Sequence, residues 1–178
     1  ETPAPSDGGG IWFQLDSEGG SEVWNQSIGS DIRATGVFYI PKNNNVTSDR
    51  NPSLVATGGD PISEVGGVAA FINTANGTIE STVDLGSDVP VSPPTTVESD
   101  FSGAVVVGTE AGDIARFSDG GSPAIDSTPT SGALTARPAQ SDGENEAYFG
   151  GESGGVVRVI ASGVSGSNTT VGGVNSGL

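Results

Sequence analysis

The chain has no cysteine, methionine or histidine, and Lys42 is its only lysine. These absences exclude disulfides, thiol nucleophiles, imidazole bases and histidine-ligated metals. The 22 acidic residues outnumber the 6 basic ones and give a net charge of −16 at pH 7. Because phosphate binding requires clustered Lys and Arg, this composition argues against nucleic acid as a partner.

The excess of acidic side chains has two interpretations. It is typical of halophilic proteins, in which concentrated salt screens the repulsion between carboxylates. An ordinary acidic secreted protein has the same composition, so the sequence leaves both interpretations open.

Long hydrophobic runs are also absent. No apolar stretch is long enough for a transmembrane segment, and no hydrophobic leader is found at the start of the chain, which begins at Glu1. We therefore expect a processed, exported protein located outside the cell or at the cell surface. A trimmed chain would begin in the same way.

Four Asn-X-Ser/Thr sequences are potential acceptors for N-linked glycosylation. They begin at Asn25, Asn45, Asn76 and Asn168, whereas a following proline disqualifies Asn51. Asn45 and Asn168 lie in polar sequence typical of loops, so we expect these two to be the better acceptors.

Glycine is abundant, with 29 residues, while hydrophobic residues make up only 33% of the chain. Such a mixture favours short strands joined by tight turns over long amphipathic helices. The length of 178 residues fits one domain. We predict an all-β fold.

Two segments repeat the same residues at a constant offset of 42 positions. They are GTEAGDIARF and GGESGGVVRV, in which Glu110 and Arg116 correspond to Glu152 and Arg158. Each follows a short apolar stretch, so the unit is predicted to be a strand, a glycine-bounded turn and a second strand.

Weaker copies of this unit extend the repeat toward the N-terminus. The equivalent positions Ile11, Val68, Ile114 and Val156 are separated by 57, 46 and 42 residues. Each is followed by a polar outer strand, predicted at residues 22–26, 79–85, 124–128 and 169–174. An Asn-rich insertion at 42–52 accounts for the longest interval, and periods in the low forties are typical of four-stranded β-propeller blades.

The segment GGGIWFQLDSEGGSEVW, which ends at Trp24, resembles the pyrroloquinoline-quinone-like (PQQ-like) propeller repeat of quinoprotein dehydrogenases and BamB-like assembly factors. The resemblance covers most of residues 8–174. It implies a β-propeller-like fold of about 3.5–4 four-stranded blades, with repeats of 42–57 residues. Only the first copy keeps the tryptophan, because Val83 and Ile125 stand near its place in the next two.

We expect the repeat domain to span 1–162, and the last outer strand with a Gly/Ser-rich tail to span 163–178. The chain opens on the third strand of a blade, so the first two strands of that blade are missing. Either a small ring closes imperfectly, or another molecule fills the gap through a head-to-tail contact, which generates rings or fibres.

The sequence offers little support for a catalytic, cofactor or metal site. The resemblance implies a quinone cofactor beside a vicinal cysteine pair, and this chain has no cysteine, so we expect no cofactor and no enzymatic activity. Glu110 and Glu152 are an obvious pair for acid–base hydrolysis of glycosides, but their recurrence at equivalent turns favours a structural role. The acidic stretch 16–22 lacks the alternating carboxylates of a calcium loop, which favours a hairpin turn.

Two further groups of residues are candidate contact sites. Arg116 and Arg158 recur at one repeat position, where we expect salt bridges between blades; binding of an anionic ligand near the axis is the alternative. Trp12 and Phe13 are adjacent on a strand and face opposite sides, so one of them is a candidate partner-binding aromatic at an exposed edge.

Taken together, the sequence predicts a non-enzymatic extracellular or cell-surface protein with a structural or interaction role. Its expected partners are copies of itself, assembled head to tail into a filament or surface layer, or other surface proteins. The alternative is a propeller module that binds a carbohydrate, peptide or anion. A more remote alternative is a fragment of a quinoprotein dehydrogenase.

Overall fold

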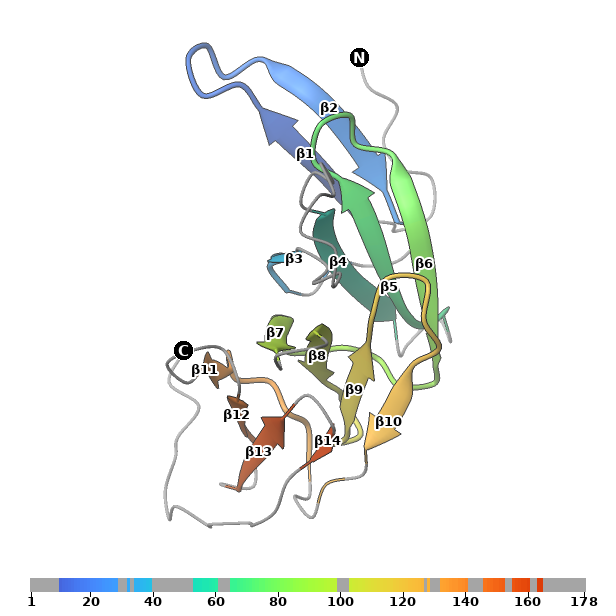
Figure 1. Cartoon of the computed structure of the whole chain (residues 1–178), viewed down its shortest axis with the longest axis vertical. Coiled ribbons are helices and arrows are strands. Elements are labelled where there is room, and N and C mark those ends of the chain that lie inside the picture. Colours follow the sequence, from blue (N-terminus) through green and yellow to red (C-terminus); the bar gives the residue numbers. More distant parts are fainter. Residues whose placement is uncertain are drawn as a thin grey trace.

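The computed structural model describes residues 10–28, 32, 34–39, 53–60, 65–98, 103–126, 128, 132–140, 146–152, 155–160 and 163–164. These residues form fourteen β-strands and no helix, arranged in four antiparallel sheets (Figure 1). The predicted all-β fold is confirmed.

Strands that follow one another in sequence are neighbours in every sheet. The first sheet contains β1 (Ile11–Leu15) and β2 (Glu22–Ser27), and the second contains β3 (Val37–Tyr39), β4 (Ser53–Asp60), β5 (Val65–Asn73) and β6 (Ile79–Gly86). The third contains β7 (Thr95–Glu98), β8 (Gly103–Gly108), β9 (Ile114–Phe117) and β10 (Ala124–Asp126). The fourth contains β11 (Ala139–Gln140), β12 (Glu146–Gly150), β13 (Val156–Ile160) and β14 (Gly163–Val164).

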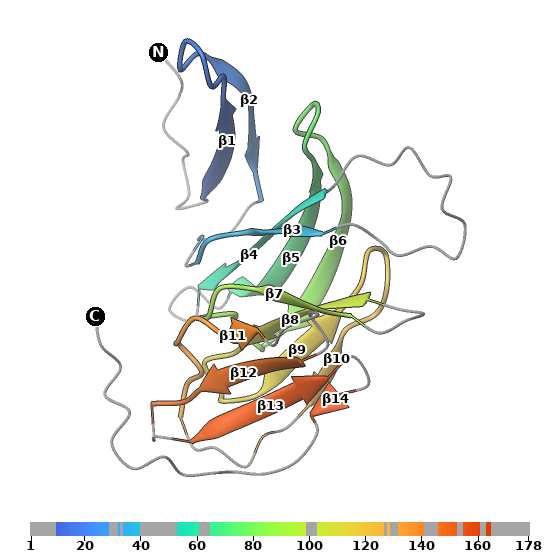
Figure 2. The same ribbon diagram turned by 60° about the vertical axis from the view of Figure 1, so that its left-hand side comes forward.

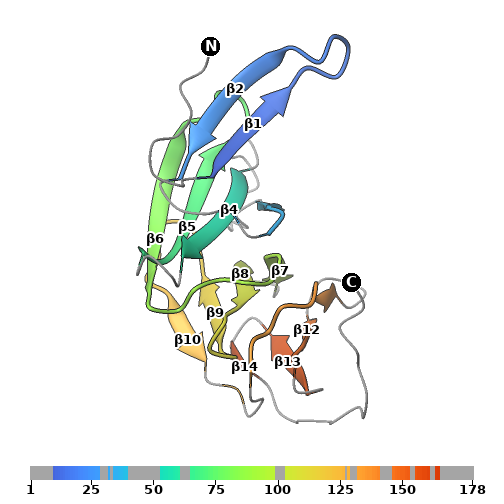
Figure 3. The same ribbon diagram turned by 180° about the vertical axis from the view of Figure 1, so that it is seen from behind.

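The sheets follow one another along an open arc. Figure 2 shows the three four-stranded sheets stacked in chain order. The first and fourth sheets lie at opposite ends of the arc, as the views from the front and from behind agree (Figures 1 and 3). The first strands of the complete sheets, β3, β7 and β11, lie on its concave side. The described strands close neither into a barrel nor into a ring.

The hairpin turns after β1 and β5 have the same geometry. In both, the backbone N–H of a glycine donates to the backbone carbonyl oxygen of the residue four positions earlier, Gly20 to Asp16 at 2.9 Å and Gly77 to Asn73 at 2.8 Å. Both glycines have positive φ, 67° and 73°, a conformation that glycine adopts without steric cost. The offset of 57 residues in the sequence therefore corresponds to a repeated local structure.

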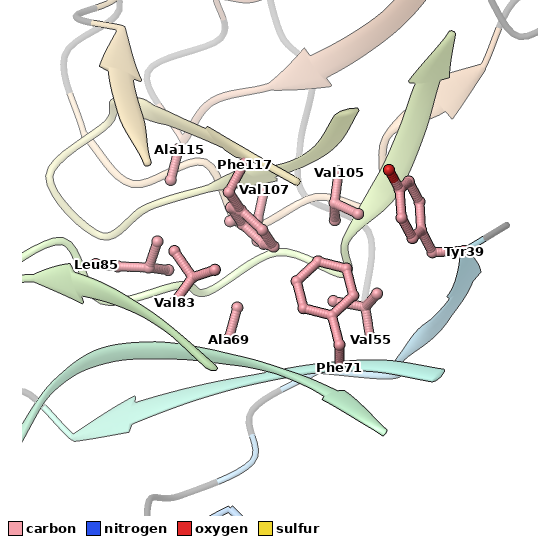
Figure 4. Close-up of a cluster of buried hydrophobic side chains, with 10 residues drawn as sticks. All are labelled: Tyr39, Val55, Ala69, Phe71, Val83, Leu85, Val105, Val107, Ala115 and Phe117. Carbon is pink, nitrogen blue, oxygen red and sulfur yellow. The ribbon is translucent and has the colours of Figure 1, made fainter. Parts of the chain in front are cut away.

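Among the described residues, hydrophobic clusters fill the spaces between successive sheets, so each sheet packs on its neighbours in chain order. The first and second sheets share a small cluster around Trp24 and Ile72. The third and fourth share a cluster that includes Ile114 and Phe149. The largest lies between the second and third sheets (Figure 4) and contains Tyr39, Val55, Ala69, Phe71, Val83, Leu85, Val105, Val107, Ala115 and Phe117.

The directions in which the side chains face correct one pair of positions that the sequence pattern indicates as equivalent. Ala69 and Phe71 face the third sheet, whereas Ile114 faces the fourth. Ala69, rather than Val68, therefore occupies the position of Ile114, and the second interval of the repeat is one residue shorter than the sequence indicates. Such a one-residue slip moves every side chain of a strand to the other face.

The predicted outer strands match β2, β6 and β10, although β10 ends at Asp126. At the end of the chain, the strand beside β13 is β14 at Gly163–Val164. The predicted strand at 169–174 and the insertion at 42–52 lie outside the described residues.

Candidate functional site

The most distinctive feature is the incomplete first sheet. In the described structure β1 pairs only with β2, whereas the third strands of the other sheets, β5, β9 and β13, have a partner on each side. Among the described residues, one edge of β1 therefore presents backbone N–H and C=O groups without a strand partner. Such an edge is a template for pairing with another strand.

An apolar groove lies beside this edge, between the first and second sheets. It has a volume of about 360 Å³ and is lined by Trp12, Gln14, Trp24, Thr35, Gly36, Phe38, Leu54 and Thr74. No charged side chain is among them. Phe38 on β3 is 67% exposed, which is unusual for a phenylalanine on the innermost strand of a sheet.

The two tryptophans of the groove differ in hydrogen bonding. Trp24 Nε1 donates to the carbonyl oxygen of Thr74 at 3.1 Å. Trp12 Nε1 is buried, and among the described residues it has no hydrogen-bond partner. A buried donor without an acceptor is costly, so this N–H marks a place where an added backbone or ligand oxygen would be favourable.

Of the two aromatic residues that the sequence indicates as candidates, the structure describes the side chain of one. Trp12 packs against the cluster between the first and second sheets, and the side chain of Phe13 lies outside the described part of the chain. Exposed apolar side chains of the first sheet are instead Ile11, Leu15 and Val23, with exposures of 38%, 54% and 52%. Together they give this end of the arc an apolar surface.

The opposite end of the arc carries a polar network on the fourth sheet. Arg158 forms an ion pair with Glu146, and the Tyr148 hydroxyl donates to the second carboxylate oxygen of Glu146 at 2.5 Å. The positions equivalent to Glu146 and Tyr148 in the third sheet are Ala104 and Val106, and both are buried. A polar outer face on a terminal repeat keeps a stacked-repeat protein soluble.

Hydrogen bonds from Arg158 and Tyr148 lower the pKa of Glu146 from 4.5 to about 2. Because the folded pKa is below the unfolded one, the stabilising effect is present above pH 4.5 and is lost as the pH falls toward about 2. We expect the Glu146 carboxyl to titrate near pH 2 by NMR and to shift back toward 4.5 in Arg158→Gln. An unchanged titration in that variant would contradict the pairing.

Glu110 and Glu152 occupy equivalent exposed turns and line one hollow of about 730 Å³ with Val91, Gly132, Ala133 and Thr135. The backbone N–H of Glu110 donates to the Val89 carbonyl at 2.9 Å, and that of Glu152 to the Ala133 carbonyl at 3.1 Å. These turns thus connect each sheet to the segment that precedes it. Two carboxylates in the lining make the hollow unfavourable for an anion.

The repeated arginines pair within their own sheets. Arg116 Nε lies 3.3 Å from Asp126 on the neighbouring strand, and Arg158 pairs with Glu146 on β12. These ion pairs connect adjacent strands of one sheet.

Two of the four sequons lie in the described structure, and both asparagines are exposed. Asn25 lies on β2, where its amide donates to Glu22 at 2.6 Å. Asn76 lies in the β5–β6 turn, where its side-chain Oδ1 accepts a hydrogen bond from the hydroxyl of Thr78, the sequon threonine, at 2.8 Å. Asn45 and Asn168 lie outside the described residues.

The acidic stretch 16–22 forms the β1–β2 turn, in which the Asp16 carboxylate accepts the amide of Gly19 at 3.0 Å. Within the described ranges, no three acidic side chains are grouped so that they could hold a metal ion.

The groove itself was not predicted from sequence. Its walls come from β1, β2, β3, β4 and the β5–β6 turn, and no local pattern connects these segments. The available signal was that the repeat pattern begins, in this sequence, at the third strand of a unit, which predicts an edge at β1.

No protein-family model matches the chain, and none of the curated proteins is significantly similar to it. In the part of the chain that the structure describes, there is no helix with the length and apolar character needed to cross a bilayer.

Proposed function

We propose that this protein is a non-enzymatic repeat protein that acts outside the cell or at its surface and assembles head to tail with copies of itself. The observation that carries the proposal is the first sheet, which in the described structure has two strands, with a free β1 edge and exposed apolar side chains at one end of the arc. A contact that joins different surfaces of two copies propagates into a ring or a filament.

A degenerate PQQ-like propeller repeat accounts for the arrangement. In the PQQ-like repeat that the sequence resembles, a tryptophan docks on the next blade. Trp24 makes a similar contact here, because it lies on the β5–β6 turn of the second sheet. A methyl group on Gly77 would come within 2.6 Å of Trp24 Cδ2, so the ring contacts the backbone directly.

The next repeat replaces this apolar contact by a polar one. Ser81 occupies the place of Trp24, since each pairs with the matching residue of the preceding strand. The Ser81 hydroxyl donates to Asp119 in the turn of the third sheet at 2.5 Å. Both contacts join the fourth strand of one sheet to the hairpin turn of the next, which supports a blade-like repeat with diverged side chains.

The test of the proposal is the mass of the full chain in solution by light scattering, measured over a range of protein concentrations at low and at molar salt. We expect the mass to rise with concentration, and more steeply at high salt because screening weakens the repulsion between chains of charge −16. Electron microscopy of the same samples should show rings or filaments. A monomer under all of these conditions would overturn the proposal.

A second candidate function is favoured by the composition of the groove. Two tryptophans and an exposed phenylalanine with no charged side chain nearby suit a neutral ligand such as a carbohydrate, which stacks on aromatic rings. A rise in melting temperature with oligosaccharides, in a protein that stays monomeric, would favour this alternative.

A further inference from the structure

We infer that residues 169–174 of a second copy pair with the free edge of β1 and cover the adjacent groove. This inference rests on the proposed head-to-tail assembly and names the segment that makes the contact.

The sequence of that segment matches the strand that occupies this place in the second sheet. There, β4 pairs with β5, which is the counterpart of β1. Residues 169–173 read Thr-Thr-Val-Gly-Gly, and residues 55–59 of β4 read Val-Ala-Thr-Gly-Gly. Both combine β-branched or small residues with a Gly-Gly pair at the same position.

The match predicts a register. Val55 pairs with Phe71, and Thr57 pairs with Ala69; the counterparts of Phe71 and Ala69 on β1 are Gln14 and Trp12. Position 169 of the donor would therefore stand opposite Gln14, and position 171 opposite Trp12. Residues paired in this way share one face of a sheet, so Val171 would enter the groove that Trp12 lines.

Three features of the groove fit an added strand. The edge of β1 supplies backbone hydrogen bonds, as in β-strand addition. The strand would cover Phe38, which is 67% exposed. Its carbonyl groups would also lie near Trp12 Nε1, the buried donor without a partner in the described structure.

Charge is compatible with this contact. The chain as a whole carries −16, yet residues 165–178 contain no charged side chain, and neither does the lining of the groove. Two copies can therefore meet here without bringing carboxylates together.

The reach of the chain points to a second copy rather than to the same one. Packed sheets are separated by roughly 10 Å, so the three steps from the fourth sheet to the first amount to roughly 30 Å along the arc (Figures 1 and 3). Between Val164, the end of β14, and position 169, the extended backbone spans at most about 18 Å. This comparison favours the β1 edge of a second copy over that of the same chain as the place where the segment pairs.

The absence of cysteine makes a crosslinking test specific. In the double variant Gln14→Cys/Thr169→Cys, opposed positions bring the two sulfurs within disulfide range. After mild oxidation at the salt concentration that favours assembly, we expect a ladder of covalent oligomers on a non-reducing gel. The matched control, Gln14→Cys/Ser176→Cys, has its second cysteine beyond the paired strand and should give little ladder.

Each other outcome overturns the inference. An internal disulfide in a monomer would mean that the segment reaches its own β1. Equal crosslinking in both variants, or none in either, would mean that another surface makes the contact. In that last case light scattering of the wild-type chain separates the two proposals, because a concentration-dependent mass would leave head-to-tail assembly standing without this strand.

A second variant tests the groove without cysteines. Val171→Glu would place a charge against Trp12 and should abolish the concentration-dependent mass, whereas Ser176→Glu adds the same charge outside the strand and should retain it. If the Val171→Glu variant assembled as the wild-type chain does, that result would contradict the inference.

Discussion

Replacing Phe71 with alanine is expected to lower the free energy of unfolding by about 3–5 kcal/mol. The Phe71 side chain is fully buried in the core between the second and third sheets (Figure 4). Its ring meets Tyr39 edge to face with centroids 5.5 Å apart and Phe117 in the same way at 6.2 Å. The substitution removes both contacts and leaves a cavity between the two sheets.

The matched control is Phe38→Ala on β3, because it deletes the same side chain from a site that is 67% exposed. We expect this change to cost less than about 0.5 kcal/mol in the monomer. Urea denaturation followed by circular dichroism measures both variants. Losses of similar size would mean that the core between these sheets is not packed as described.

Replacing Trp24 with alanine is expected to cost about 3–5 kcal/mol and to release the first sheet from the second. Trp24 is 9% exposed, contacts the turn at Gly77 and donates a hydrogen bond to Thr74. A two-stranded hairpin is marginally stable by itself in water. We therefore expect the first sheet to depend strongly on this contact.

Hydrogen exchange separates local release from global unfolding. In Trp24→Ala we expect the amides of β1 and β2 to lose protection while those of β5 and β8 keep most of theirs. Trp24→Phe should retain part of the protection, since it keeps a six-membered aromatic ring but loses the pyrrole ring with its N–H. The control Val23→Ala changes the adjacent residue, which is 52% exposed, and should leave exchange unchanged. Uniform loss of protection across all sheets would contradict this local role.

Strand positions were predictable because glycine turns and short apolar runs mark them. The hairpin that begins with Ile11 and ends near Trp24 and the outer strands at 22–26 and 79–85 follow from this local signal. The face of β5 was not predictable. Residues 68–72 read Val-Ala-Ala-Phe-Ile, and both faces of the strand are buried, so there is no alternation of polar and apolar residues to fix the register.

Of the candidate site, the sequence predicted the edge at β1 but not the groove beside it. The repeat pattern predicts the pairing of β1 with β2, but the exposure of Phe38 and the orientation of Trp12 depend on how separate segments pack. Likewise, the sequence shows that tryptophan is lost from the second repeat. It does not show that Ser81 and Asp119 replace the contact by a hydrogen bond, because these residues are 38 positions apart.

In the described structure each hydrophobic cluster lies between two successive sheets, and no cluster is shared by all four. An additional four-stranded unit inserted between the second and third sheets would need only two compatible faces, and the rest of the chain would be unaffected. Tandem duplication could thus lengthen the protein in steps of one sheet. Under tension or heat, the same organisation would let the ends detach first, so the molecule would yield gradually instead of failing at once.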